Sequence, residues 1–261
     1  MYFKKIVFLV LAPIIYSLSY SNDFPLRKKY SDLTPISTKQ LIKDYDKSVI
    51  VDVRSEFEYK VVHIQKAINL PLSKRSFYSK MKKKMLKNPN VPFVFYCNGI
   101  TCSKSYKATQ KLHDKGHKNI FVYDAGVFAW VKKNPKKSFL LGDSPVDTSK
   151  LIAKKDFQSK MLAFNDFDKG ASLKESLLID IRDKFQIKFI PKFKFKNKIK
   201  TITLTKLQKV LKSGYLKKEK TLYIYDAVGK QVRWLQYYLE KYAYKNYFFL
   251  KGGVNSVKKN K

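Results

Sequence analysis

The chain has 261 residues and a formal net charge of +35, and 44% of its residues are hydrophobic. This length allows one large or two ordinary domains with well-packed cores. Only five of the 55 basic residues are arginine, and lysine is spread over the whole chain. Because specific recognition of nucleic acids favours arginine, the charge argues against a specific nucleic-acid partner and indicates a lysine-rich solvated surface. Weak attraction to anionic surfaces is the alternative.

Residues 1–21 are predicted to be a cleaved signal peptide. Lys4 and Lys5 precede an apolar run from Ile6 to Tyr16, and Ser19 and Ser21 fit a signal peptidase site. An uncleaved membrane anchor is the alternative, but the apolar run is short for a membrane span. No other segment approaches spanning length, so we expect a soluble, exported protein, most simply in a bacterial periplasm.

The next predicted elements lead to a cysteine. Apolar strands are expected at 49–53 and 91–96, and the second ends at Cys97. The segment 104–112 has helical spacing and Gly116 ends it before another strand at 119–123. A thiol is therefore expected where a buried strand gives way to a loop and then to a helix.

Cys97 is the candidate nucleophile. Loop amides and the dipole of the following helix favour a thiolate, so the sequence predicts a lowered pKa for Cys97. A thiolate is what nucleophilic cysteine chemistry requires. Taken alone, a cysteine after a strand is more often a small buried hydrophobe.

The motifs around Cys97 resemble the rhodanese family of sulfurtransferases. Residues 33–132 carry the family's features in the right order, although Val62 and Lys66 stand where glycines are usual. The matching features are Asp52-Val53-Arg54, Glu58-Tyr59, His63-Ile64, Ala67-Ile68-Asn69-Leu70-Pro71, the Cys97 loop and Gly126 with Trp130. The resemblance implies an α/β fold with a central, mainly parallel sheet and helices on both faces.

The resemblance also implies a reaction and a binding loop. In this family a loop cysteine, here Cys97, takes a sulfane sulfur from thiosulfate or a polysulfide-type donor and passes it to a thiol or cyanide. The loop amides would hold the anion, and these belong to Asn98, Gly99, Ile100, Thr101, Cys102 and Ser103. No cofactor is implied. A phosphatase of the Cys-x5-Arg type is unlikely to be encoded here, because position 103 is serine.

The second half of the chain repeats the first. Residues 176–182 resemble 48–54, and 222–226 resemble 93–97. The repeat predicts a rhodanese-like domain at 33–133, a linker at 134–146 and a second, degenerate domain at 147–261. The second copy has Asp226 in place of Cys97, so it offers no nucleophile.

Cys102 and the stretch 189–196 each allow two interpretations, and the histidines argue against a metal site. Cys102 is either a small residue at the helix start or a second thiol able to form a disulfide with Cys97. The stretch 189–196, which replaces the His-Ile run, is predicted to be an edge strand, with a docking surface for an acidic partner as the alternative. The three histidines, His63, His113 and His117, are too scattered for a metal site.

Together these features predict an exported sulfurtransferase that works through a Cys97 persulfide. Its expected partners are a small sulfur-donor anion and a thiol acceptor, either free or on a protein, without a specific nucleic acid. A non-catalytic sulfur carrier or protein-binding module is the first alternative. A thiol-disulfide enzyme that uses Cys97 and Cys102 is the second.

Overall fold

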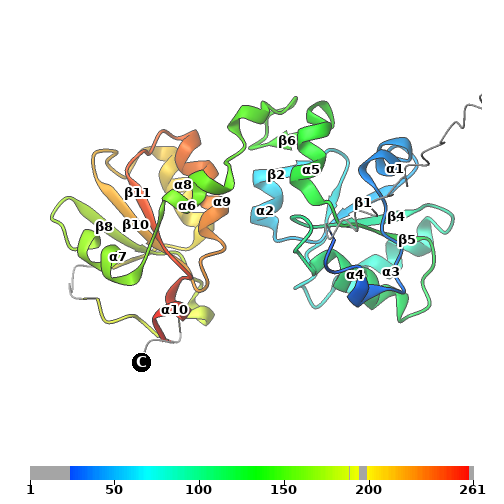
Figure 1. Ribbon diagram of the computed structural model, residues 1–261, viewed down its shortest axis with the longest axis horizontal. Coiled ribbons are helices and arrows are strands. Elements are labelled where there is room, and N and C mark those ends of the chain that lie inside the picture. Colours follow the sequence, from blue (N-terminus) through cyan, green and yellow to red (C-terminus); the bar gives the residue numbers. More distant parts are fainter. Residues whose placement is uncertain (1–23, 188, 194–198, 259–261) are drawn as a thin grey trace, which may run out of the picture.

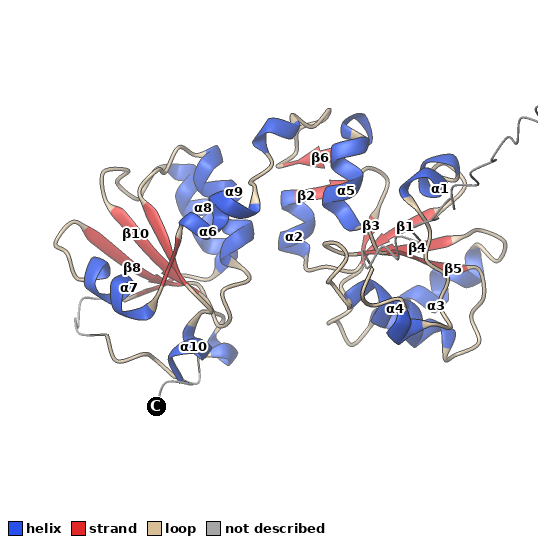
Figure 2. Ribbon diagram, in the orientation of Figure 1, coloured by secondary structure: helices blue, strands red, loops and turns tan. Residues whose placement is uncertain are grey.

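The computed structural model describes residues 24–187, 189–193 and 199–258. It contains two parallel sheets, each flanked by helices on both faces, which confirms the predicted α/β fold with two similar domains (Figures 1 and 2). The predicted signal peptide lies outside the described residues. In the part of the chain that is described, no helix is long and apolar enough to cross a membrane.

The first domain is built on four parallel strands in the order β3-β1-β4-β5. These strands are β1 (Val49–Asp52), β3 (Ile68–Asn69), β4 (Phe93–Tyr96) and β5 (Ile120–Tyr123). The helices are η1 (Lys28–Tyr30), α1 (Thr38–Lys43), α2 (Glu56–Val61), α3 (Phe77–Lys87), α4 (Lys104–His113) and α5 (Gly126–Lys133).

Alternate residues of each strand pack against different helices, because successive side chains of a strand point to opposite faces. Ile50 and Val94 join the core under α1, α2 and α5, whereas Val51 and Phe95 join the core under α3 and α4. Figure 1 shows the two helical layers on either side of the sheet. All four residues of β4 are buried, so the strand that ends at Cys97 lies in the middle of the domain.

The stretch 134–146, predicted to be a linker, is partly structured. It contains η2 (Pro135–Lys137) and β6 (Ser138–Leu140), and β6 pairs antiparallel with β2 (Val62–Ile64) of the first domain. The Trp130 indole donates to the Lys137 carbonyl at 3.0 Å, which holds the start of this stretch on α5. The chain therefore leaves the first domain only after this two-stranded sheet.

The second domain has the same strand arrangement, in the order β9-β8-β10-β11-β7. Its strands are β7 (Met161–Leu162), β8 (Ser176–Asp180), β9 (Lys200–Thr201), β10 (Thr221–Tyr225) and β11 (Tyr247–Leu250), and its helices are η3 (Thr148–Lys150), α6 (Lys154–Ser159), α7 (Phe164–Ala171), η4 (Lys184–Gln186), α8 (Leu204–Ser213), α9 (Val232–Lys241) and α10 (Val254–Lys258). In the second domain β7 pairs with β11. At the corresponding place in the first domain there is a single parallel bridge between Pro35 and Val122. The internal repeat is thus a repeat of topology.

The edge-strand prediction for 189–196 is wrong where the structure describes this stretch, because 189–193 form no strand and β9 is the edge. Phe193 instead packs near Phe167 and Tyr225, with ring centroids 6.4 and 5.6 Å away. Aromatic burial over α7 outweighs the alternation of lysine and phenylalanine that suggested a strand.

The two domains share a continuous apolar core in which α9 of the second domain faces α2 and α5 of the first. Phe128 stacks on Trp234 with ring centroids 5.7 Å apart and planes 12° apart. Phe57 meets Tyr238 at 5.3 Å. Both α9 rings are almost fully buried, so the second domain is packed firmly against the helices that surround the Cys97 loop.

Candidate active site

Cys97 lies at the carboxyl end of β4, directly before the loop that leads to α4. Its side chain is buried, with 1% of its surface exposed. The Cys97 thiol donates to the Cys102 carbonyl, with Sγ and O 3.0 Å apart, and Sγ lies 3.3 Å from Ser105 Oγ. Ser105 is in the first turn of α4, so the helix N-terminus points at the sulfur, as the sequence predicted.

The pKa values of the two thiols are shifted in opposite directions. Burial raises the pKa of Cys97, and the adjacent Cys102 raises it further. The pKa of Cys102 is lowered to about 6, mainly because the Cys97 thiol hydrogen-bonds its sulfur, with help from the amides of Asn98 and Lys104 and from the Lys104 charge. The predicted lowering of the Cys97 pKa is therefore wrong for this state. The charge of the pair lies on Cys102, which is the more exposed sulfur.

The predicted binding loop is held by backbone contacts at both ends. Cys102 N–H donates to Gly99 O at 2.8 Å, and Val127 N–H donates to Cys97 O at 3.0 Å. Gly126 presses against the loop so closely that a Cβ there would lie 2.3 Å from Gly99 N. Between these contacts the loop faces outward, because Ile100 and Thr101 are exposed. Ser103 is half-buried before α4. Anion binding by residues 98–103 stays a prediction.

Asn98 connects the loop to a small polar cluster. Its side-chain amide donates to Glu58 Oε1 at 2.9 Å, and Lys104 Nζ lies 3.2 Å from Glu58 Oε2. Burial tends to raise the Glu58 pKa, but Lys104, Arg54 and the hydrogen bonds lower it, so Glu58 is ionised at neutral pH. Lys104 is the cation nearest the loop in sequence, and Glu58 largely compensates its charge.

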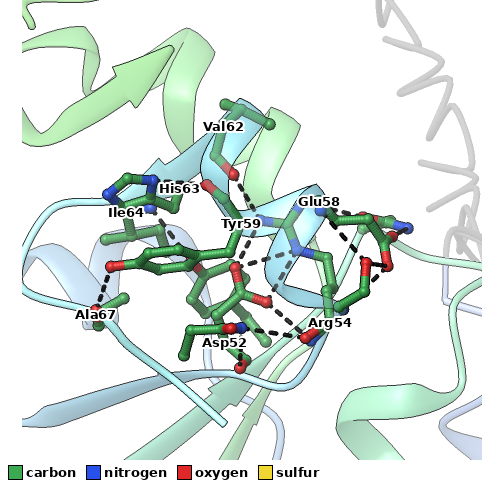
Figure 3. Close-up of polar contacts among 12 residues, drawn as sticks. Asp52, Arg54, Glu58, Tyr59, Val62, His63, Ile64 and Ala67 are labelled. Atoms are coloured by element: carbon green, nitrogen blue, oxygen red, sulfur yellow. Dashed lines mark hydrogen bonds and ion pairs between the residues drawn. The ribbon is translucent and has the colours of Figure 1, made fainter. Parts of the chain in front are cut away.

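Arg54 and Asp52 of the Asp52-Val53-Arg54 motif form a buried ion pair. Figure 3 shows the Arg54 guanidinium between Asp52 and the Val62 carbonyl. Arg54 Nη2 donates to the Val62 carbonyl oxygen at 2.6 Å. Burial alone would lower the Arg54 pKa, but the charge and hydrogen bonds of Asp52 raise it, so Arg54 stays charged. Its Nη1 also donates to Asn98 Oδ1 at 3.2 Å. The ion pair therefore supports the Cys97 loop directly.

His63 stabilises the turn after α2, as predicted. Its Nδ1 lies 2.8 Å from the Tyr59 carbonyl and its ring stacks on the Tyr59 ring (Figure 3). Burial lowers the pKa of His63 and keeps the ring neutral at pH 7. Within 24–187, 189–193 and 199–258, no group of three or more His, Cys, Asp or Glu side chains could hold a metal ion.

The corresponding loop of the second domain carries its own anion. Asp226 Oδ1 accepts from the amides of Val228, at 2.9 Å, and Gly229. Its Oδ2 accepts from the amides of Gln231 and Val232, at 2.5 and 3.3 Å. Four inward-pointing amides thus bind one carboxylate, which is the type of anion site that the sequence predicted for the first loop.

Three residues near Cys97 were not predicted to belong to the site. The sequence shows Glu58 only as a residue of a motif, and it shows Ser105 only as a hydroxyl residue after the loop. Trp234 reaches the site through Arg54, because its ring lies 5.5 Å from the Arg54 guanidinium carbon. No sequence signal links these two residues, because the contact crosses between the domains.

Comparison with known proteins identifies the first domain. The family model of the rhodanese-like domain matches residues 34–133. Proteins called tRNA uridine(34) hydroxylase are similar to this chain: the one from Pelagibacter ubique is 30% identical over 50% of this chain and 40% of its own length, and the one from Hamiltonella defensa is 34% identical over 39% and 28%. The chain thus spans less than half the length of these relatives.

Solved structures give weaker likenesses. Thiosulfate sulfurtransferase from Pseudomonas aeruginosa is 18% identical, with 85% of this chain and 41% of that chain covered and a TM-score of 0.36. BH2092 protein from Bacillus halodurans is 24% identical, with 47% and 88% covered and a TM-score of 0.38. The assignment therefore rests on the family model and on the motifs around Cys97. Residues 34–133 are therefore a rhodanese-like domain.

Proposed function

We propose that the protein is a sulfurtransferase that carries a sulfane sulfur as a persulfide on Cys97. The observation that carries this proposal is the place of Cys97, at the end of β4 and beneath the N-terminus of α4, with an ionised thiol beside it. A buried thiol next to a base is the arrangement that nucleophilic catalysis uses. The second domain contributes no thiol, since Asp226 stands at the corresponding position.

In this mechanism Cys102 is the base for Cys97. As Cys97 Sγ attacks the outer sulfur of thiosulfate, its proton passes to the Cys102 thiolate, which already accepts a hydrogen bond from it. The bond between the two thiosulfate sulfurs breaks, and sulfite leaves with the electron pair. A thiol acceptor then takes the outer sulfur of the persulfide and restores Cys97.

The loop amides are proposed to hold the charge that develops on sulfur. The Asp226 loop supports this, because the same turn in the second domain binds a carboxylate through four amides without a cationic side chain. Lys104 adds little positive potential while Glu58 is ionised. We therefore expect small sulfur-donor anions such as thiosulfate to be held mainly by the loop amides and only weakly by Lys104.

We further propose that the protein is exported, on the basis of the signal-peptide pattern at residues 1–21. The relatives are called tRNA uridine(34) hydroxylases, and the chain covers less than half of their length. We take from them the chemistry of the shared domain, and propose a thiol, free or on a protein, as the acceptor.

Intact-mass spectrometry after exposure to thiosulfate or polysulfide tests the proposal. With Cys102→Ser, which keeps only one thiol, we expect a mass gain of one sulfur atom. Cys97→Ser should gain none, because a serine hydroxyl has far too high a pKa to act as the nucleophile. Sulfur uptake on Cys102 in Cys97→Ser at the rate of the unaltered protein would overturn the assignment of Cys97.

A further inference from the structure

The chain has two cysteines, and the fold brings both into one loop. The Cys97 thiol donates to the Cys102 carbonyl, with Sγ and O 3.0 Å apart, so the two cysteines are in direct contact. Cys97 is buried, whereas Cys102 is half-exposed at the start of α4. The turn closed by Cys102 N–H and Gly99 O keeps the two residues together.

We propose that Cys102 attacks the Cys97 persulfide, forms a Cys97–Cys102 disulfide and releases hydrosulfide. The protein would then reduce sulfane sulfur to sulfide, with an external dithiol as the reductant that restores both thiols. This activity rests on the proposed sulfurtransferase function, because it begins from the Cys97 persulfide. It differs from sulfur transfer in its product, which is free sulfide rather than a persulfide on an acceptor.

The step balances without an added oxidant. A bond forms between the two Sγ atoms, and the bond between Cys97 Sγ and the outer sulfur breaks. The proton that Cys102 took from Cys97 moves to the outer sulfur, which leaves with the electron pair as HS⁻. The outer sulfur is reduced by two electrons, which the two cysteines supply as they form the disulfide. The persulfide sulfur is therefore the oxidant in this step.

Three features suit Cys102 to this attack. Its backbone carbonyl already accepts the Cys97 thiol at 3.0 Å, so the two residues are in contact and the attack needs no movement of a domain or helix. The amides of Asn98 and Lys104 lower the Cys102 pKa independently of the Cys97 proton, so they still favour the thiolate when Cys97 carries a persulfide. Cys102 is also accessible, so an external dithiol can reach the disulfide through this residue.

The test uses the reduced full chain and one equivalent of thiosulfate, whose leaving group is sulfite and not sulfide, without any acceptor thiol. We measure free sulfide with a fluorescent trap and the protein mass in parallel. The unaltered protein should release about one sulfide per chain and lose two hydrogens. Because the attack is intramolecular, sulfide release from the loaded unaltered protein should be at least about tenfold faster than release from fully loaded Cys102→Ser. This variant lacks the base and therefore loads more slowly, but once loaded it should retain one extra sulfur.

The outcomes separate this inference from the proposed function. If Cys102→Ser takes up sulfur and the unaltered protein keeps a stable persulfide with no sulfide released, the inference is wrong and the transferase function stands. If neither protein takes up sulfur, both proposals fall. A thermal unfolding curve for Cys102→Ser shows whether the variant is folded. A dithiol such as dithiothreitol should return the oxidised protein to its starting mass and permit a second round of release.

Discussion

The loops that follow β4 and β10 occupy the same place in the two domains and are supported in the same way. A glycine presses on each loop, with a hypothetical Gly126 Cβ 2.3 Å from Gly99 N and a Gly253 Cβ 2.4 Å from Val228 N. The residue after that glycine donates to the carbonyl of Cys97 at 3.0 Å and to that of Asp226 at 2.9 Å. The loops differ in what fills them.

Asp226 fills its loop with a carboxylate that four amides bind, whereas Cys97 presents a thiol that donates to the Cys102 carbonyl. The second loop is therefore occupied by its own side chain. The residue at the end of the strand thus decides whether such a loop presents a thiol or is closed by a fixed structural contact. The comparison also indicates what the amides of such a loop can hold.

The largest effect should follow from removing the carboxylate of the second loop. Asp226→Ser leaves buried amides without an acceptor, so we expect the free energy of unfolding to fall by about 3 kcal/mol. The matched change Cys97→Ser should lower it by less than about 1 kcal/mol, because a hydroxyl can still donate to the Cys102 carbonyl. Urea unfolding of both variants measures the difference, and equal losses would contradict the proposed structural role of Asp226.

The next effect concerns the thiols. Alkylation by iodoacetamide should modify Cys102 first and should persist down to about pH 6, below the range in which an ordinary thiol reacts. Cys97→Ala removes the hydrogen bond that lowers the Cys102 pKa most, so the midpoint should rise by more than about one unit. Peptide mapping across the pH range identifies the modified residue. Preferential alkylation of Cys97 would show that the charge lies on the other sulfur.

Much of this comparison could be predicted from sequence because the repeat preserves the strand ends. Cys97 and Asp226 could be aligned, and the parallel sheets followed from the family resemblance. The charge on Cys102 could not be predicted, since it depends on the burial of Cys97 and on how the loop folds back over it. The packing of 189–193 was missed because alternation along a strand and aromatic burial in a loop produce similar patterns.

The contact between the domains should affect catalysis through Trp234. This ring lies over Arg54, which donates to Asn98, and it stacks on Phe128 of α5. Trp234→Ala should therefore loosen the Cys97 loop and lower kcat about tenfold, with little change in KM. Tyr238→Ala is the control, because it removes a ring from the same interface without touching Arg54. Equal effects of the two variants would assign Trp234 to packing alone.

The smallest effect should come from Lys104, whose charge Glu58 compensates at 3.2 Å. Lys104→Met should raise KM for thiosulfate only about two- to threefold, since a half-exposed ion pair contributes little. Glu58→Gln should lower KM, because it frees the positive charge of Lys104 while the one glutamine oxygen keeps the capping box at Ser55. The Asn98 side-chain amide then loses its Glu58 acceptor.

An uncharged organic trisulfide serves as the control donor for both variants, since neither change should alter its KM. The opposite signs of the two KM shifts follow from the exposed position of Lys104 beside the loop. If both variants raise KM for thiosulfate, the polar cluster of Asn98, Glu58 and Lys104 acts by holding the shape of the loop. The second domain shows that loop amides suffice to bind an anion, so a lysine here can adjust affinity without being essential.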